Sequence, residues 1–161
     1  MTSRYPLTIA GTTIEEMQNG DTLILPTSAS ALQFKVSNID EPSTVSATAA
    51  TGTINYDITT QSVLYYTLSA GGNFTINFRG SSGTTLAALM AVGDSISVSF
   101  LNTNGATPYA SGWTGSLYYT GGIKPTTVAI SSAEVNVFTY TILKVGSGTY
   151  SVLAGNTIFQ I

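Results

Sequence analysis

INYDITTQSVLYYTLSAGGNFTINFRGSSGT, residues 54–84, is the stretch that decides the fold class. In its second half Phe74, Ile76 and Phe78 alternate with polar residues, and this period of two is typical of a β-strand with one buried face. One aspartate and one arginine are the only charged residues of the stretch, so hydroxyl and amide side chains must form its opposite face. The stretch therefore predicts β-strands whose outer surface carries few charges.

The same pattern continues toward the C-terminus. SISVSFL (residues 95–101) alternates in the same way, and long β-branched and aromatic runs follow at residues 134–144 and 149–161. Because only a short glycine-containing segment separates the last two runs, we expect them to form a hairpin. One short helix is predicted within residues 83–94 from the helical spacing of its apolar side chains. Together these segments predict an all-β fold, an antiparallel β-sandwich, for which a jelly roll is one fitting arrangement.

Residues 1–50 hold few large apolar side chains, too few for a core of their own, and predict an N-terminal arm. Thr13 followed by Glu16 has the form of a capping box, which predicts a short helical turn that Gly20 ends. Short strands are predicted within residues 22–39.

The Ser-, Thr- and Ala-rich residues 40–52 predict a linker. The expected organisation is an anchoring arm at residues 1–50 and a β-sandwich domain at residues 51–161. The residues of the arm that we expect to bind a neighbouring protein are Arg4, Tyr5, Pro6, Leu7, Ile9, Ile14, Met17, Leu23 and Leu25.

Charge is the main anomaly of the composition. Charged residues make up 8% of the 161 residues, against roughly 25% in an average globular protein. Three interpretations fit: a surface covered by partner chains, an exposed surface rich in hydroxyls, or an unusual soluble domain. The five basic residues are scattered, which disfavours nucleic-acid binding, and the absence of an eighteen-residue apolar run disfavours a membrane span.

Catalytic chemistry finds little support in the sequence. The chain has no histidine and no cysteine, which removes the commonest general base and the usual ligands of zinc. Asp57, Asp94 and Glu134 are available for glycosidase chemistry, but nothing in the sequence pairs them, so we expect no enzyme and no cofactor. Calcium stays open. Its possible ligands are Asp40 with Glu41, or the group of Glu15, Glu16 and Asp21.

Four aromatic residues form a second candidate site. Tyr109, Trp113, Tyr118 and Tyr119 lie among glycines in the least regular part of the sequence, where we expect long loops around one short strand at residues 117–119. Aromatic side chains on loops can stack on a sugar or anchor a partner chain. The alternative is that Tyr118 or Tyr119 packs into the core from the short strand.

Two parts of the sequence carry a resemblance. RYPLTIAGTTIEEMQNGDTLILP (residues 4–26) is similar to a leading segment of tailed-phage virion proteins. NYDITTQSVLYYT, NFTINFRGSSGTTL, GATPYA and FTYTILKVGSGTYSVLAGNTIF resemble a β-rich module of structural proteins from marine and cyanobacterial phages. These strings cover most of residues 54–160 and contain no catalytic motif.

The resemblance implies a non-enzymatic virion structural protein, assembled in the host cytoplasm and exposed on the particle surface. We expect the 161 residues to be the complete chain, a size that suits a capsid decoration (cement) protein. Its expected partners are the major capsid protein and copies of itself, as a homotrimer. The alternative is a tail-fibre or head-fibre component that binds a host surface glycan or receptor.

Overall fold

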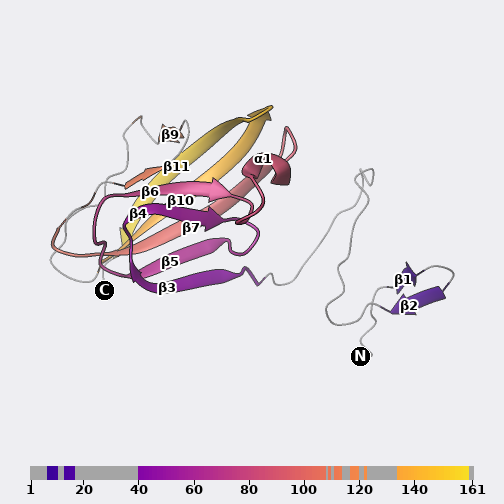
Figure 1. Cartoon of the computed structure of the whole chain (residues 1–161), viewed down its shortest axis with the longest axis horizontal. Helices are drawn as coiled ribbons and strands as arrows, with labels where there is room; N and C mark the ends of the chain where they lie inside the picture. Colours follow the sequence, from indigo (N-terminus) through magenta and orange to yellow (C-terminus); the bar gives the residue numbers. More distant parts are fainter. Residues whose placement is uncertain are drawn as a thin grey trace. The chain divides into compact units, whose positions relative to one another are not determined.

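A computed structural model forms the basis of the description. It describes residues 7–10, 13–16, 40–107, 109, 111–113, 117–119, 122 and 134–159. The chain divides into two compact units, Met1–Ile39 and Asp40–Ile161 (Figure 1).

The described part of the first unit is a small antiparallel hairpin. It consists of β1 (Leu7–Ala10) and β2 (Thr13–Glu16), with Ile9 opposite Ile14. The predicted helical turn at Thr13 is therefore wrong. Thr13 and Ile14 are β-branched and favour a strand, and this preference outweighs the capping-box spacing. The strands predicted within residues 22–39 lie outside the described residues.

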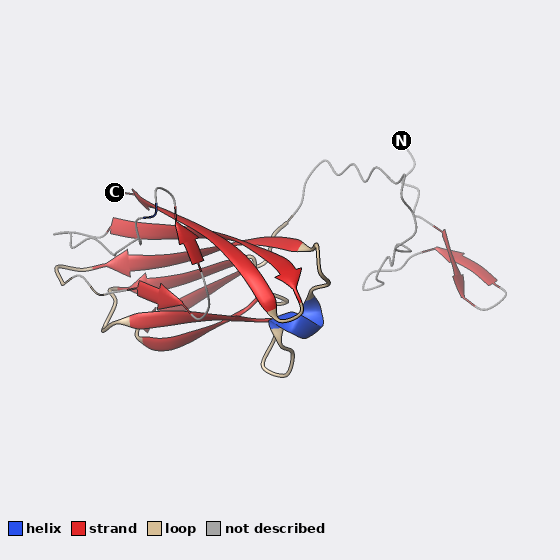
Figure 2. Cartoon of the chain, turned by 90° about the horizontal axis from the view of Figure 1, so that it is seen from above, coloured by secondary structure: helices blue, strands red, loops and turns tan. Residues whose placement is uncertain are grey.

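The described part of the second unit contains two sheets and one short helix, which confirms the all-β prediction with one short helix. The six-stranded sheet has the order β3 (Ser43–Ala49), β5 (Val63–Leu68), β7 (Ser95–Asn104), β10 (Glu134–Gly146), β11 (Thr149–Phe159) and β9 (Leu117–Tyr119). The three-stranded sheet has the order β4 (Gly52–Asp57), β6 (Phe74–Arg79) and β8 (Ser111–Trp113). The helix α1 (Leu86–Leu89) follows β6 and lies at one end of the strands (Figure 2).

The chain changes sheet at every step from β3 to β9, and from β3 to β8 strands two apart in the sequence are neighbours. β3, β5 and β7 lie side by side in parallel, and so do β4, β6 and β8. The arrows of β4 and β6 accordingly point the same way in Figure 1. The predicted antiparallel arrangement is wrong for these pairings and for β9 with β11, and it is correct for the pairing of β7 with β10 and for the hairpin of β10 and β11. The jelly roll, which is built from antiparallel strands, is not confirmed.

β3 lies within the segment that the sequence predicted to be a linker. Ser43 pairs with Val63 of β5, which makes β3 an edge strand of the large sheet. Its Ser, Thr and Ala residues are mostly exposed, so the composition of an edge strand resembled that of a loop. The prediction of a loop is wrong here, and the second unit begins at Asp40 because β3 belongs to its sheet.

The core lies between the two sheets and is rich in aromatic rings. Phe100 of β7 contacts Phe74 of β6 with ring centroids 5.6 Å apart, and Phe78 of β6 contacts Tyr140 of β10 at 5.0 Å. Phe74 and Ile76 are buried and Phe78 packs against them, as their alternation predicted. These contacts join the sheets through one common core.

The helix α1 begins and ends with side-chain hydrogen bonds. The Thr85 hydroxyl oxygen accepts a bond from the Ala88 amide at 3.2 Å. At the other end, the buried Lys144 ammonium donates to the carbonyl oxygens of Ala87 at 2.8 Å and Met90 at 2.6 Å. Because the last carbonyls of a helix have no partner within it, Lys144 of β10 fastens the helix to the large sheet.

The burial of Tyr56 makes the free energy of unfolding depend on pH in the alkaline range. Its ring is fully buried, and its hydroxyl donates to the carbonyls of Ser62 at 2.6 Å and Ser99 at 3.0 Å. Burial raises the pKa of Tyr56 above its ordinary value. The folded state therefore keeps the phenol neutral while the unfolded chain ionises near pH 10. The stabilisation is fully present below that pH and is lost as the pH rises toward the folded pKa.

We expect the free energy of unfolding to fall above pH 10 by up to about 1.4 kcal/mol per pH unit for this residue. Urea unfolding of the wild type and Tyr56→Phe between pH 7 and 11 measures the slope, with pH values chosen to bracket the ordinary tyrosine pKa of about 10. Burial also raises the pKa of Tyr66, so the variant should keep a shallower slope. Equal slopes in the two proteins would contradict the assignment to Tyr56.

Candidate functional site

The outer face of the three-stranded sheet is polar, and its side chains pair across the parallel strands. The pairs in register are Thr53 with Thr75, Asn55 with Asn77, and Asp57 with Arg79. The Asn77 amide donates to the Asn55 side-chain oxygen at 2.9 Å. Arg79 donates through Nε and Nη2 to the two carboxylate oxygens of Asp57, the Nη2 contact measuring 3.2 Å. This ion pair raises the pKa of Arg79, and the face has the properties of an ordinary solvated surface.

The outer face of the six-stranded sheet is different, because it carries no charged residue in the described part of the chain. We call it the uncharged face. Strand alternation and register assign to it Ser43, Val45, Val63, Tyr65, Thr67, Ser95, Ser97, Ser99, Leu101, Thr103, Tyr118, Val135, Val137, Thr139, Thr141, Leu143, Val145, Thr149, Ser151, Leu153, Gly155, Thr157 and Phe159.

An apolar row crosses the uncharged face. Val45, Tyr65, Leu101 and Val137 face one another in turn on β3, β5, β7 and β10. Large apolar side chains toward the edges are well exposed, with Val45 at 64% and Phe159 at 59%. The apolar row is thus continuous over the four strands from β3 to β10, and apolar side chains are accessible at the margins of the face.

The two charges of β10 lie on the inner side of the sheet. Glu134 is 3% exposed and Lys144 is 9% exposed, and they share this side with Phe138 and Tyr140. Strands of soluble proteins usually bury the apolar side chains and place charges in water. In β10 the aromatic residues are buried as usual, but the two charges are buried with them, and valine, threonine and leucine residues occupy the outer positions. Such an arrangement is expected where the outer side is also covered.

Two buried asparagines accompany Glu134 on the inner side. Asn102 and Asn136 face each other on β7 and β10, and both are fully buried. The Asn102 amide nitrogen donates to the Thr103 carbonyl at 3.1 Å. Sequence reasoning missed these residues, although they share the phase of the core phenylalanines along each strand.

The predicted arm residues are described only in part. Leu7 and Ile9 lie in β1 and Ile14 lies in β2. Six others lie outside the described residues: Arg4, Tyr5, Pro6, Met17, Leu23 and Leu25. The hairpin brings Ile9 and Ile14 into register.

Three of the four aromatic candidates lie in strands of the two sheets, and Tyr109 lies outside the strands. Trp113 lies in β8, where it pairs with Ile76, and Tyr119 lies in β9, where it pairs with Ala154. Tyr118 is 59% exposed beside Leu153 on the uncharged face, whereas Tyr109 is half-buried against the core. The strand predicted at residues 117–119 is confirmed as β9. β8 was missed because it is short and glycine-containing.

The three carboxylates considered for catalysis have separate positions. Asp57 is engaged by Arg79. The Asp94 carboxylate accepts a hydrogen bond from the Ala91 backbone amide at 2.7 Å. The backbone carbonyl of Asp94 accepts a hydrogen bond from the Lys144 backbone amide at 3.0 Å. Glu134 begins β10 at the other end, which at 3.3 Å per residue is roughly 30 Å away. Asp94 and Glu134 therefore cannot act on one glycosidic bond.

The calcium candidates are divided between the two units. The Glu41 carboxylate accepts a bond from the Ser62 hydroxyl at 3.0 Å, Glu15 and Glu16 lie in β2, and Asp21 lies outside the described residues. No group of three or more acidic side chains that could hold a metal ion occurs within the described segments.

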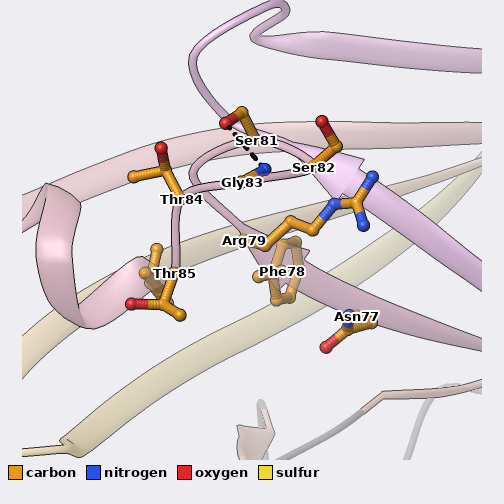
Figure 3. A pocket seen from close by; sticks show the side chains of 9 residues that line it. Asn77, Phe78, Arg79, Ser81, Ser82, Gly83, Thr84 and Thr85 are labelled. Carbon is orange, nitrogen blue, oxygen red and sulfur yellow. Dashed lines mark hydrogen bonds between the residues drawn. The ribbon is translucent and has the colours of Figure 1, made fainter.

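A pocket of about 440 Å³ lies where β6 leads into α1 (Figure 3). It is lined by Asn77, Phe78, Arg79, Ser81, Ser82, Gly83, Thr84, Thr85 and Leu86. Its one cation is Arg79, whose charge Asp57 already balances. The pocket is therefore a neutral, hydroxyl-lined depression, without a group that could activate a substrate.

Comparisons with known proteins identify no relative: no family model, no curated protein and no solved structure matches the chain. Within the part of the chain that the structure describes, no helix has the length and apolar character needed to cross a membrane.

Proposed function

We propose that the chain is a non-enzymatic structural protein of a phage virion, a capsid decoration protein present in many copies. The observation that carries the proposal is the burial of Glu134 and Lys144 on the inner side of β10, which leaves an outer face without charge in the described part of the chain. A sheet with these properties suits packing against protein better than exposure to water. The resemblance of residues 4–26 to leading segments of virion proteins supports the same function.

In this proposal the two units have different tasks. The arm at residues 1–39 binds the major capsid protein, and the two facing sheets form a sandwich that lies on the shell among other copies. Such a protein stabilises the assembled shell by mass action, because it binds the lattice and not the free capsid subunit. An interface of about 800 Å² per partner is sufficient for specific binding.

Deletion of residues 1–26 is expected to abolish co-sedimentation with purified capsids, because it removes β1, β2 and most of the arm. The second unit should keep its far-UV circular dichroism and its cooperative unfolding, since its core lies between residues 50 and 154. The matched control is Asn55→Ser on the polar face, which should bind capsids like the wild type. Capsid binding by the truncated chain would show that the arm is not the anchor.

The alternative function is a fibre component that binds a host glycan or receptor, and the 59% exposure of Tyr118 favours it. Quantitative mass spectrometry of purified virions separates the two functions. Decoration requires a copy number comparable to that of the major capsid protein, whereas a fibre component would be far scarcer.

A further inference from the structure

We infer that a second copy of this chain packs on the uncharged face, sheet against sheet. The inference rests on the proposed function, in which many copies of the chain lie together on the capsid. It adds to that function by assigning the contact between copies to named strands. These strands are β5, β7, β10 and β11, whose outer side chains form the centre of the face.

The absence of charge favours a copy of the same chain as the partner. A partner with a charged surface would lose the hydration of its charges on this face and would find no opposite charge there. When the partner is a second uncharged face, no charge loses its hydration and no charge is left without an opposite charge. On the described surface of the chain, the outer face of the smaller sheet carries the Asp57–Arg79 pair, so the uncharged face is the better match for itself.

The geometry also suits self-association. A twofold axis through the face would place the same strands of two copies opposite each other, which is the commonest symmetry of homo-oligomers. Two sheets pack about 10 Å apart with their strands within about 30° of each other. The outer positions of β10 and its neighbours carry Val, Leu, Thr and Ser, which are small enough for such close approach.

The size of the face predicts a modest affinity. Five strands of the face, β5, β7, β10 and β11 of its centre together with β3, lie about 4.8 Å apart and have about seven residues each. They cover roughly 500 Å², which is below the 800 Å² per partner of a standard interface. We expect a dissociation constant of the order of micromolar in solution. On a shell that already holds the copies close together, the same contact would form readily.

Thr139 is the position for the test, because it is exposed and lies near the centre of the face, between Ser99 and Gly155. Sedimentation equilibrium of the full chain over a wide concentration range should show reversible self-association of the wild type. Thr139→Lys should weaken it at least about tenfold, equivalent to about 1.4 kcal/mol. Asn55→Lys, an exposed position on the polar face, is the matched control and should associate like the wild type.

A mixing experiment separates a lost contact from a damaged fold. Thr139→Lys and Thr139→Glu should each associate weakly alone, and a mixture of the two should associate more strongly than either, because opposite charges then meet. A wild type that is monomeric at all concentrations, or a Thr139→Lys variant that associates as well as the wild type, overturns the inference. A mixture no stronger than its components also overturns it.

Co-sedimentation with purified capsids distinguishes a failure of this inference from a failure of the proposed function. If the wild type is monomeric but decorates capsids, the inference fails and the proposed function stands. If the wild type associates through Thr139 and binds no capsid, the inference stands and the proposed function fails.

Discussion

Phe100→Ala is expected to lower the free energy of unfolding by about 3–5 kcal/mol, the usual cost of a large cavity in an aromatic core. Phe100 is fully buried. Its ring centroid lies 5.7 Å from that of Tyr66, 5.6 Å from Phe74 and 6.2 Å from Phe138. It therefore touches strands of both sheets, and its removal weakens the contact between them as well as the packing within the large sheet.

Urea unfolding followed by tyrosine fluorescence measures this loss. The matched control is Phe159→Ala, since Phe159 is 59% exposed at the margin of the uncharged face. Its cost in the isolated chain should be below about 1 kcal/mol. If Phe100→Ala were as mild as the control, the two sheets would not share one core.

Lys144→Met is expected to lower the free energy of unfolding by about 2–4 kcal/mol, because hydrogen bonds from a charged donor are worth about 1.5–3 kcal/mol each. The substitution keeps most of the unbranched apolar stem and removes both bonds to the C-terminal end of α1. The carbonyl oxygens of Ala87 and Met90 then lose the donor that satisfies them. The positive charge near the helix C-terminus, which is favourable there, disappears as well.

Arg79→Met is the matched control for Lys144→Met, because Arg79 is also a cation but lies in an ion pair that water reaches, with its side chain 29% exposed. Ion pairs in contact with water contribute little, so thermal unfolding should change much less than in Lys144→Met. Hydrogen exchange at the Met90 amide, which bonds to the Leu86 carbonyl at 3.1 Å, should accelerate in Lys144→Met alone. Unchanged stability and exchange in Lys144→Met would show that the ammonium does not hold the helix.

The existence of most strands followed from the sequence, but their neighbours did not. Phe74, Ile76 and Phe78 showed by alternation that residues 74–79 form a strand with one buried face. Alternation has the same period in parallel and antiparallel sheets, so it did not reveal that β6 pairs with β4 and not with β5. That pairing depends on where the chain crosses between the sheets, which is a property of the loops.

The uncharged face was visible in the sequence only in part. The small share of charged residues in the sequence indicated that part of the surface is covered, but it did not show which strands form that surface. The signal that places it is the phase of residues 134–145, where the glutamate and the lysine share their phase with Phe138 and Tyr140. Two charges in phase with aromatic core residues imply that the opposite phase, with its valines and threonines, faces outward.

The arm shows the limit of local signals. Thr13 and Glu16 have the spacing of a capping box, yet they lie in a strand. A cap contributes only about 1 kcal/mol, so it does not decide the structure of a segment whose β-branched residues favour an extended backbone.

The alternation of the chain between two sheets has a consequence for the order of folding. β10 and β11 are joined by a tight turn in which Gly146 pairs with Thr149, so they close with little loss of chain entropy. Val63 must instead find Ser99, and Ser43 must find Val63. Non-local pairings of this kind form late and slowly. The hairpin is therefore the expected template on which β7, β5 and β3 assemble in turn, in the reverse of their order of synthesis, and β3 is the strand that should exchange its amide hydrogens first.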